Sequence, residues 1–324
     1  MMEALTIHLF YFALLNLLMI DFGYRSIRYV RIQQSWIILL FSIFTIHLIF
    51  LKDDPTIRMF ALIATAFTAM KVIATIESYE GSTFNLSFFQ WVIFVVGWAG
   101  MRAQPFENLG STALPNAWSN IRVGVTRIVA GVLLVFSAHR LRELHMDEEI
   151  RYVTVTAILL VAFSLILHFG WLRVSMGVWR LLGVRTYLLF KEPLKSVSIH
   201  EFWSKRWNLA FSEMTSIALF RPLKNKIGGA WASMLAFLFS GLLHEMALSL
   251  PVRNGYGLPL LYFVIQWAGV MAERELFRRK AKFLENRLLS RVWTCLWLLV
   301  PLPLLFHDHF VRGIIWPIVG IAYS

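Results

Sequence analysis

A series of long apolar runs constrains this chain more than any other feature of its sequence. They fall at roughly 4–20, 35–51, 57–76, 84–101, 123–139, 152–171, 229–250, 257–272 and 288–306, with a further run at 311–323. A helix needs about 20 apolar residues to cross a bilayer, and lipid offers no water to an open backbone. The sequence therefore predicts an all-α, polytopic transmembrane helix bundle of about 8–10 spans, some tilted or re-entrant. We expect a single membrane-embedded domain over residues 1–324.

Composition and charge support a membrane protein and argue against a nucleic-acid-binding one. Hydrophobic residues make up 58% of the chain and charged residues 15%, and the net charge is +12. The basic residues lie mostly between the apolar runs, where they act as orientation signals and contact anionic headgroups. We therefore expect an integral, multi-pass protein of the bacterial inner membrane or the endoplasmic reticulum, with the lipid bilayer as a partner and no nucleic acid.

Basic loops predict the orientation of the bundle. Arg25, Arg28 and Arg31 follow the first run, and the segment from Glu273 to Arg291 holds seven Lys and Arg residues. The positive-inside rule places both loops in the cytoplasm. The section 172–228 is also basic and is expected on the same side, whereas the basic residues at 140–151 fit this orientation poorly.

The section 172–228 is the one compositional break in the chain. It mixes Trp, Arg, Lys, Pro and Ser with apolar runs that are too short to span. Irregular backbone at membrane depth is tolerated only when it is buried in protein or lines a cavity. We expect this section to line a chamber.

The segment 198–208 within that section begins like a helix. Ser198 and Glu201 have the spacing of a capping box, and Glu201 and Lys205 the spacing of an ion pair. Trp203 and Trp207 should share one helical face.

Two interpretations of this segment remain open. Trp beside Lys and Arg is typical of an interfacial helix that only anchors the protein. Asn208, at its end, is a candidate polar group of a site, because an amide drawn into an apolar interior needs partners.

His244 is the sharpest chemical signal, since between Gly228 and Val252 only His244 and Glu245 are titratable. An ionisable residue inside a membrane span is by default a functional-site hypothesis. A neutral, desolvated imidazole suits general-base catalysis on a hydroxyl. The alternative is a structural histidine that bonds a neighbouring helix. Glu245 lies about 100° around the helix and would orient the ring only through an intermediary.

Other polar residues give weaker signals. His307, Asp308 and His309 are interpreted as a solvated loop and not as a metal site, because two histidines at i,i+2 do not share a helix face. Lys71 is expected to snorkel or pair, and His168 to end a span at the interface. No metal site is predicted.

Two stretches together resemble one family. The segment from Ser198 to Asn208 is similar to the Ser-x-x-x-Phe-Trp-x-x-Arg-Trp-Asn signature of wax synthase-type membrane-bound O-acyltransferases. The segment from Phe237 to Glu245 is similar to the Phe-x-x-Ser-Gly-x-x-His-Glu segment of that family, and the resemblance covers roughly 190–251. Ser204 and Lys205 stand where a Gly-Arg pair is common, which puts substrate detail in doubt.

The resemblance implies acyl transfer from acyl-coenzyme A to an alcohol inside a catalytic chamber, with no further cofactor. His244 would be the general base, and Asn208 would orient the thioester or donate to the oxyanion. Trp203, Lys205, Arg206 and Trp207 are candidate contacts for acyl-coenzyme A. A lipophilic long-chain alcohol that yields a wax ester is the leading acceptor.

Several alternatives stay open at this point. The acceptor could be a sterol, a terpenoid, a polyketide or a sugar hydroxyl, and the donor could be as short as acetyl. A secondary transporter would also be polytopic, but it would more often show repeated halves, which the sequence lacks. A membrane scaffold would not need a histidine in mid-span.

Overall fold

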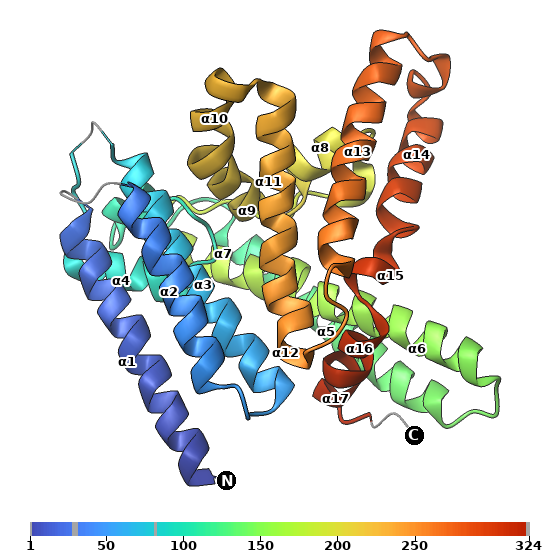
Figure 1. Ribbon diagram of the computed structural model, residues 1–324, viewed down its shortest axis with the longest axis horizontal. Coiled ribbons are helices and arrows are strands. Elements are labelled where there is room, and N and C mark those ends of the chain that lie inside the picture. Colours follow the sequence, from blue (N-terminus) through green and yellow to red (C-terminus); the bar gives the residue numbers. More distant parts are fainter. Residues whose placement is uncertain (1, 28–31, 81–82, 322–324) are drawn as a thin grey trace.

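The computed structural model describes residues 2–27, 32–80 and 83–321, and within these ranges the regular structure is entirely helical (Figure 1). The first group of helices consists of α1 (Met2–Ser26), α2 (Ile32–Ile49), α3 (Pro55–Ser78), α4 (Phe88–Gly97) and the short 3₁₀ helix η1 (Gln104–Asn108). Within this group α3 is the central helix. In its most apolar stretch of 18 residues 72% are buried, whereas in that of α1 11% are buried. Its start is defined by Asp54, whose side chain accepts the Thr56 N–H at 2.8 Å.

A long hairpin follows, and glycines set its close packing. It consists of α5 (Ala117–Arg142) and a continuous 34-residue helix formed by α6 (Glu148–Phe163), the π-helical stretch η2 (Ser164–Trp171) and α7 (Leu172–Leu181). A Cβ added at Gly124 would lie 2.8 Å from the Gly170 carbonyl oxygen, and one at Gly131 would lie 2.8 Å from that of Ala162. Small residues at such a seam let two membrane helices approach backbone to backbone.

Short helices fill the section between this hairpin and the last long helices. They are η3 (Pro193–Lys195), α8 (Ile199–Glu201), the π-helical turn η4 (Phe202–Arg206), α9 (Leu209–Thr215), the π-helical turn η5 (Ser216–Phe220) and α10 (Arg221–Ile227). The break expected at 172–228 therefore begins ten residues later, because residues 172–181 continue the spanning helix as α7.

The C-terminal part contains two long helices that lie side by side, followed by shorter ones (Figure 1). Its elements are α11 (Gly229–His244), the π-helical turn η6 (Glu245–Ser249), α12 (Leu250–Val252), α13 (Leu258–Arg278), η7 (Lys282–Leu284), α14 (Arg287–Leu299), α15 (Leu302–Leu305), α16 (Asp308–Phe310), the π-helical turn η8 (Val311–Ile315) and α17 (Trp316–Ile318). The run at 311–323 does not form a spanning helix, since η8 and α17 end at Ile318.

His307 lies inside the protein, so the prediction of a solvated loop was wrong for it. Its side chain is 3% exposed, its Nδ1 accepts the Phe310 N–H at 3.2 Å, and its Nε2 lies 3.3 Å from the Ser249 hydroxyl. The imidazole thus caps α16 and joins it to η6. A His-Asp-His triplet is polar, so the sequence alone suggests an exposed loop.

Six described helices are long and apolar enough to cross a membrane, and α4 and the stretch Gln34–Ile49 of α2 are shorter apolar helices. The prediction of an all-α polytopic bundle is confirmed. The basic loop between α13 and α14 lies at the top of the view in Figure 1, whereas the loop between α5 and α6 lies near the bottom. This geometry explains why the basic residues at 140–151 conflicted with the others. Arg28 and Arg31 lie outside the described residues.

Lys71 neither snorkels nor forms an ion pair in the described structure. It is 1% exposed, and its Nζ donates to the carbonyls of Phe94 at 2.8 Å, Val95 at 2.7 Å and Trp98. These carbonyls belong to the end of α4, where a helix leaves backbone acceptors without intrahelical partners, although that of Phe94 also accepts the Trp98 N–H at 3.4 Å. Lys71 therefore caps a helix that stops inside the bundle.

We expect Lys71→Met to destabilise the protein, because it leaves buried carbonyls without a donor at about 1–3 kcal/mol for each such group. The temperature of half-denaturation in detergent should fall by roughly 5–10 °C, as followed by size-exclusion chromatography after heating. Lys52→Met, at an exposed lysine, is the matched control and should leave this temperature unchanged. An equal temperature for Lys71→Met and the unchanged protein would contradict the capping role.

Candidate active site

The hydrogen bonding of His244 defines which of its nitrogens is free. Nδ1 lies 2.7 Å from the backbone carbonyl oxygen of Ser240, one turn earlier in α11. A carbonyl only accepts, so Nδ1 carries the proton, and in a neutral imidazole Nε2 is then an unprotonated acceptor. This is the tautomer that a general base needs.

Aromatic rings surround this imidazole on two sides. The Phe263 ring of α13 lies 4.5 Å from the His244 ring between centroids, and the Phe211 ring of α9 lies 6.3 Å away. The His244 side chain nevertheless remains partly accessible. An apolar setting that leaves the ring accessible favours a neutral base over a purely structural histidine.

Asn208 lies at the join between two short helices, in a conformation that few residues adopt. Its φ is 42° and its ψ is 63°, which is the left-handed region that Asn tolerates better than most residues. Its Oδ1 accepts the Phe211 N–H at 3.3 Å and so caps α9. Within the described residues its Nδ2 makes no hydrogen bond, which leaves an amide donor for a ligand.

The two candidate residues meet through Phe211. Its backbone N–H contacts the side chain of Asn208, and its ring faces His244. The helices α9 and α11 that carry the pair are in direct contact. Residues 36 positions apart in the sequence thus belong to one region of the fold.

The π-helical turn η4 changes the pairing that was expected before Asn208. Glu201 Oε1 accepts from Arg206 Nε at 2.7 Å, so Glu201 pairs with Arg206 and the prediction of Lys205 as its partner was wrong. A π-turn aligns residues five apart and not four, which moves Arg206 onto the face of Glu201. The Ser198 hydroxyl accepts the Glu201 N–H at 2.9 Å as predicted, but the carboxylate of Glu201 accepts from Val197 N and not from Ser198 N.

The same turn separates the two tryptophans, which do not share one face. Trp203 Nε1 donates to Gln266 Oε1 of α13 at 3.3 Å, and its ring lies 5.6 Å from Phe263. Trp207 stacks on Phe202 at 5.4 Å and contacts Phe190 edge-on at 4.9 Å. Both rings connect η4 to its neighbours within the bundle.

Of the four candidate contacts for acyl-coenzyme A, only Lys205 is an exposed side chain without a hydrogen bond or ion pair among the described residues. Arg206 is held by Glu201 and by the carbonyls of Lys191 and Glu192, at 3.3 and 3.4 Å. Trp203, Arg206 and Trp207 therefore shape the segment that carries Asn208. Their contact with a coenzyme stays a prediction.

His168 is placed differently from the expected span end. It lies within the continuous helix Glu148–Leu181, in an aromatic cluster with Phe190 at 4.6 Å and Trp207 at 5.4 Å. Its Nδ1 is 3.3 Å from the Ser164 hydroxyl. His168 thus packs against the residue that precedes Asn208, a neighbourhood that hydropathy does not reveal.

A polar network that the sequence did not suggest holds α9 from its other side. The Tyr187 hydroxyl donates to Glu213, and Arg102 pairs with the same carboxylate at 3.0 Å. Burial and the hydrogen bond to Glu213 raise the pKa of the Tyr187 phenol, so it remains a donor at neutral pH. The network ties α9 to the chain that follows α4.

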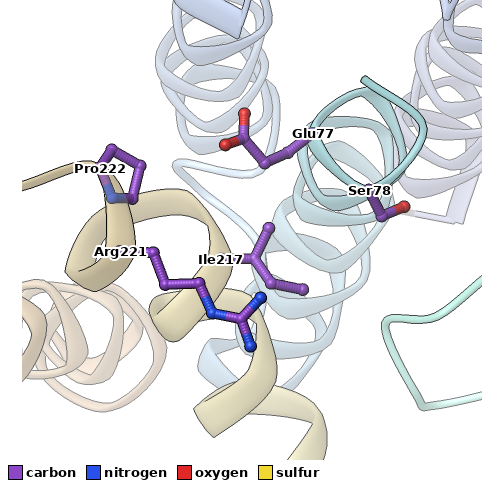
Figure 2. A pocket seen from close by; sticks show the side chains of 5 residues that line it. All are labelled: Glu77, Ser78, Ile217, Arg221 and Pro222. Atoms are coloured by element: carbon purple, nitrogen blue, oxygen red, sulfur yellow. The ribbon is translucent and has the colours of Figure 1, made fainter. Parts of the chain in front are cut away.

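A pocket opens at the end of α3 that is nearest to α10 (Figure 2). It has a volume of about 450 Å³ and is lined by Glu77, Ser78, Ile217, Arg221 and Pro222. Glu77 and Arg221 line the same pocket without forming an ion pair within the described chain (Figure 2). Neither His244 nor Asn208 is part of this lining.

Comparison with known proteins identifies the region that holds both candidate residues. Residues 187–265 match the model of the membrane bound O-acyl transferase family. The predicted family resemblance is confirmed. Asn208 and His244 both fall inside the matched segment, and the six apolar helices agree with an integral, multi-pass membrane protein.

Several curated proteins that are similar to part of this chain come from plants. Probable long-chain-alcohol O-fatty-acyltransferase 6 of Arabidopsis thaliana is 28% identical over 132 residues, which cover 36% of this chain and 38% of the relative. Long-chain-alcohol O-fatty-acyltransferase of Simmondsia chinensis is 33% identical over 73 residues, which cover 20% and 21%. Probable long-chain-alcohol O-fatty-acyltransferase 1 of Arabidopsis thaliana is 28% identical over 162 residues, which cover 48% and 46%. The chain thus spans less than half the length of each of these relatives.

Proposed function

We propose that this protein is an acyl-coenzyme A:alcohol O-acyltransferase that acts on a long-chain alcohol within the membrane. The observation that carries the proposal is the unprotonated Nε2 of His244, in an apolar helix that contacts the helix capped by Asn208. The class of acceptor is taken from the plant relatives, which are named long-chain-alcohol O-fatty-acyltransferases.

The chemistry follows from these two side chains. His244 Nε2 takes the proton of the alcohol hydroxyl while the oxygen attacks the thioester carbonyl carbon. Negative charge then develops on the carbonyl oxygen, and the free Nδ2 of Asn208 is the donor that would stabilise it. Collapse of the tetrahedral intermediate breaks the carbon–sulfur bond and forms the ester. The imidazolium returns its proton to the coenzyme A thiolate.

The surroundings suit substrates of this kind. A long-chain alcohol and the acyl tail partition into the bilayer, so they reach a site between helices without crossing water. Basic side chains such as Lys205 near the Asn208 segment suit the phosphates of coenzyme A. The reaction as written uses only protein groups and the two substrates.

The test is an assay for ester formation. Membranes containing the protein would receive labelled palmitoyl-coenzyme A and a panel of long-chain, sterol, terpenoid, polyketide and sugar alcohols, beside membranes from the same host without the protein. We expect labelled ester with the long-chain alcohols first of all. If ester forms only with an alcohol of another class, that class is the acceptor and the long-chain assignment is wrong. Flux of a substrate across vesicles without ester formation would favour transport instead.

A further inference from the structure

The carboxylate of Glu245 lies at the start of a helix that has no side-chain cap of its own. Gly257 occupies the N-cap position of α13 and offers no side chain to the first turn. Glu245 Oε1 accepts the Leu260 N–H of that turn at 2.9 Å. The first N–H groups of a helix lack intrahelical partners and carry partial positive charge, so a carboxylate is well suited to them. Glu245 thus caps α13 from another helix.

A close contact one turn earlier in α11 fixes the same residue of α13. A Cβ added at Gly241 would lie 2.6 Å from Leu260 Cδ1 and 3.0 Å from Leu260 Cα. Gly241 and Glu245 are four residues apart and lie on one face of the helix. Steric contact and hydrogen bond together hold Leu260 in one register against α11.

Phe263 connects this fixed position of α13 to His244. It lies three residues after Leu260 on the same side of α13, and its ring is 4.5 Å from the imidazole between centroids. Among the described residues, Glu245 makes no hydrogen bond to His244. Glu245 therefore acts on the His244 ring only indirectly: it binds Leu260, and Phe263 on the same helix contacts the ring.

We propose that Glu245 is a positioning residue: by capping α13 it holds Phe263 against His244, so that Nε2 is aimed for proton transfer. This rests on the acyl transfer proposed above. The other carboxylate oxygen, Oε2, is buried and has no hydrogen-bond partner within the described chain. Only Oε1 makes the capping bond, so the proposed role rests on an acceptor oxygen at that position.

Two variants of equal length separate the acceptor from the charge. Glu245→Gln keeps an oxygen that can accept the Leu260 N–H, and Glu245→Met removes it. We expect Glu245→Met to lower kcat for ester formation by up to ~100-fold with KM within about twofold, since small misplacements of a catalytic group cost this much. Glu245→Gln should retain kcat within about threefold, because the capping bond is kept. Asn286→Ala removes the cap of α14, which bonds the Leu288 and Leu289 N–H groups, and should leave kcat unchanged for the protein that remains folded.

A second measurement keeps the test independent of the reaction. Hydrogen–deuterium exchange of the peptide 258–263 reports the Leu260 N–H, and it should be faster in Glu245→Met but not in Glu245→Gln or Asn286→Ala. If the unchanged protein forms no ester with any acceptor, the proposed function fails while exchange still decides whether Glu245 caps α13. Unaltered exchange in Glu245→Met, or an equal loss of kcat in Glu245→Gln and Glu245→Met, would overturn the positioning role.

Discussion

Replacing His244 with alanine should lower kcat for ester formation by about 10²- to 10⁴-fold, the range that general-base catalysis supplies. The reason lies in Nε2, which the bond from Nδ1 to the Ser240 carbonyl leaves unprotonated. Without this nitrogen the alcohol would have to lose its proton unaided. The measurement is the initial rate of labelled ester formation, normalised to the amount of folded protein in detergent.

Two controls separate chemistry from folding in this experiment. His244→Gln keeps a polar side chain that can donate to the Ser240 carbonyl but cannot take a proton, so it should be as inactive as His244→Ala. His139→Ala removes a histidine near the end of α5, far along the chain from the site, and should retain activity. A rate in His244→Gln or His244→Ala close to that of the unchanged protein would refute the assignment of the base.

Replacing Asn208 with aspartate should lower kcat by about 10²- to 10³-fold while the protein still folds. Aspartate tolerates the left-handed conformation at φ 42° and can accept the Phe211 N–H, so the cap of α9 is retained. What it lacks is the Nδ2 donor, and at neutral pH it adds a negative charge where the oxyanion would form. The loss should therefore appear in kcat and not in the yield of folded protein.

Asn116→Asp is a matched control, because Asn116 is also a left-handed residue, φ 62°, at the N-cap of a helix. It should leave the rate unchanged. Asn208→Gly keeps the backbone conformation without any side chain, and it should be as slow as Asn208→Asp but less stable. Full activity in Asn208→Asp would return Asn208 to a capping role alone.

The sequence predicted those parts of the fold that depend on hydropathy and local spacing. Apolar runs of spanning length predicted the helices, and a lone histidine in one of them indicated the candidate base. The capping spacing of Ser198 and Glu201 likewise predicted where α8 begins. These signals depend on residues close together in the sequence, so they can be read without knowledge of tertiary contacts.

The sequence could not predict features that depend on the register of neighbouring helices. Because η4 is a π-helical turn, Glu201 pairs with Arg206, and Trp203 and Trp207 contact different neighbours. An α-helical period of 3.6 residues predicts neither arrangement. Lys71 and His307 look exposed as isolated polar residues, yet both are buried. Lys71 is bound by the distant end of α4, and His307 lies between the start of α16 and the distant Ser249. For the same reason the contact of Asn208 with the His244 region, through Phe211, appears only in three dimensions.

The acceptor that selects the tautomer of His244 belongs to the backbone, so the tautomer does not depend on the Ser240 side chain. The Ser240 hydroxyl is occupied elsewhere, since it donates to the Ala236 carbonyl at 2.9 Å. A residue of similar size at this buried position that keeps α11 helical would still present the same carbonyl to Nδ1. The unprotonated Nε2 is thus a property of the helical backbone of α11 and not of the serine hydroxyl.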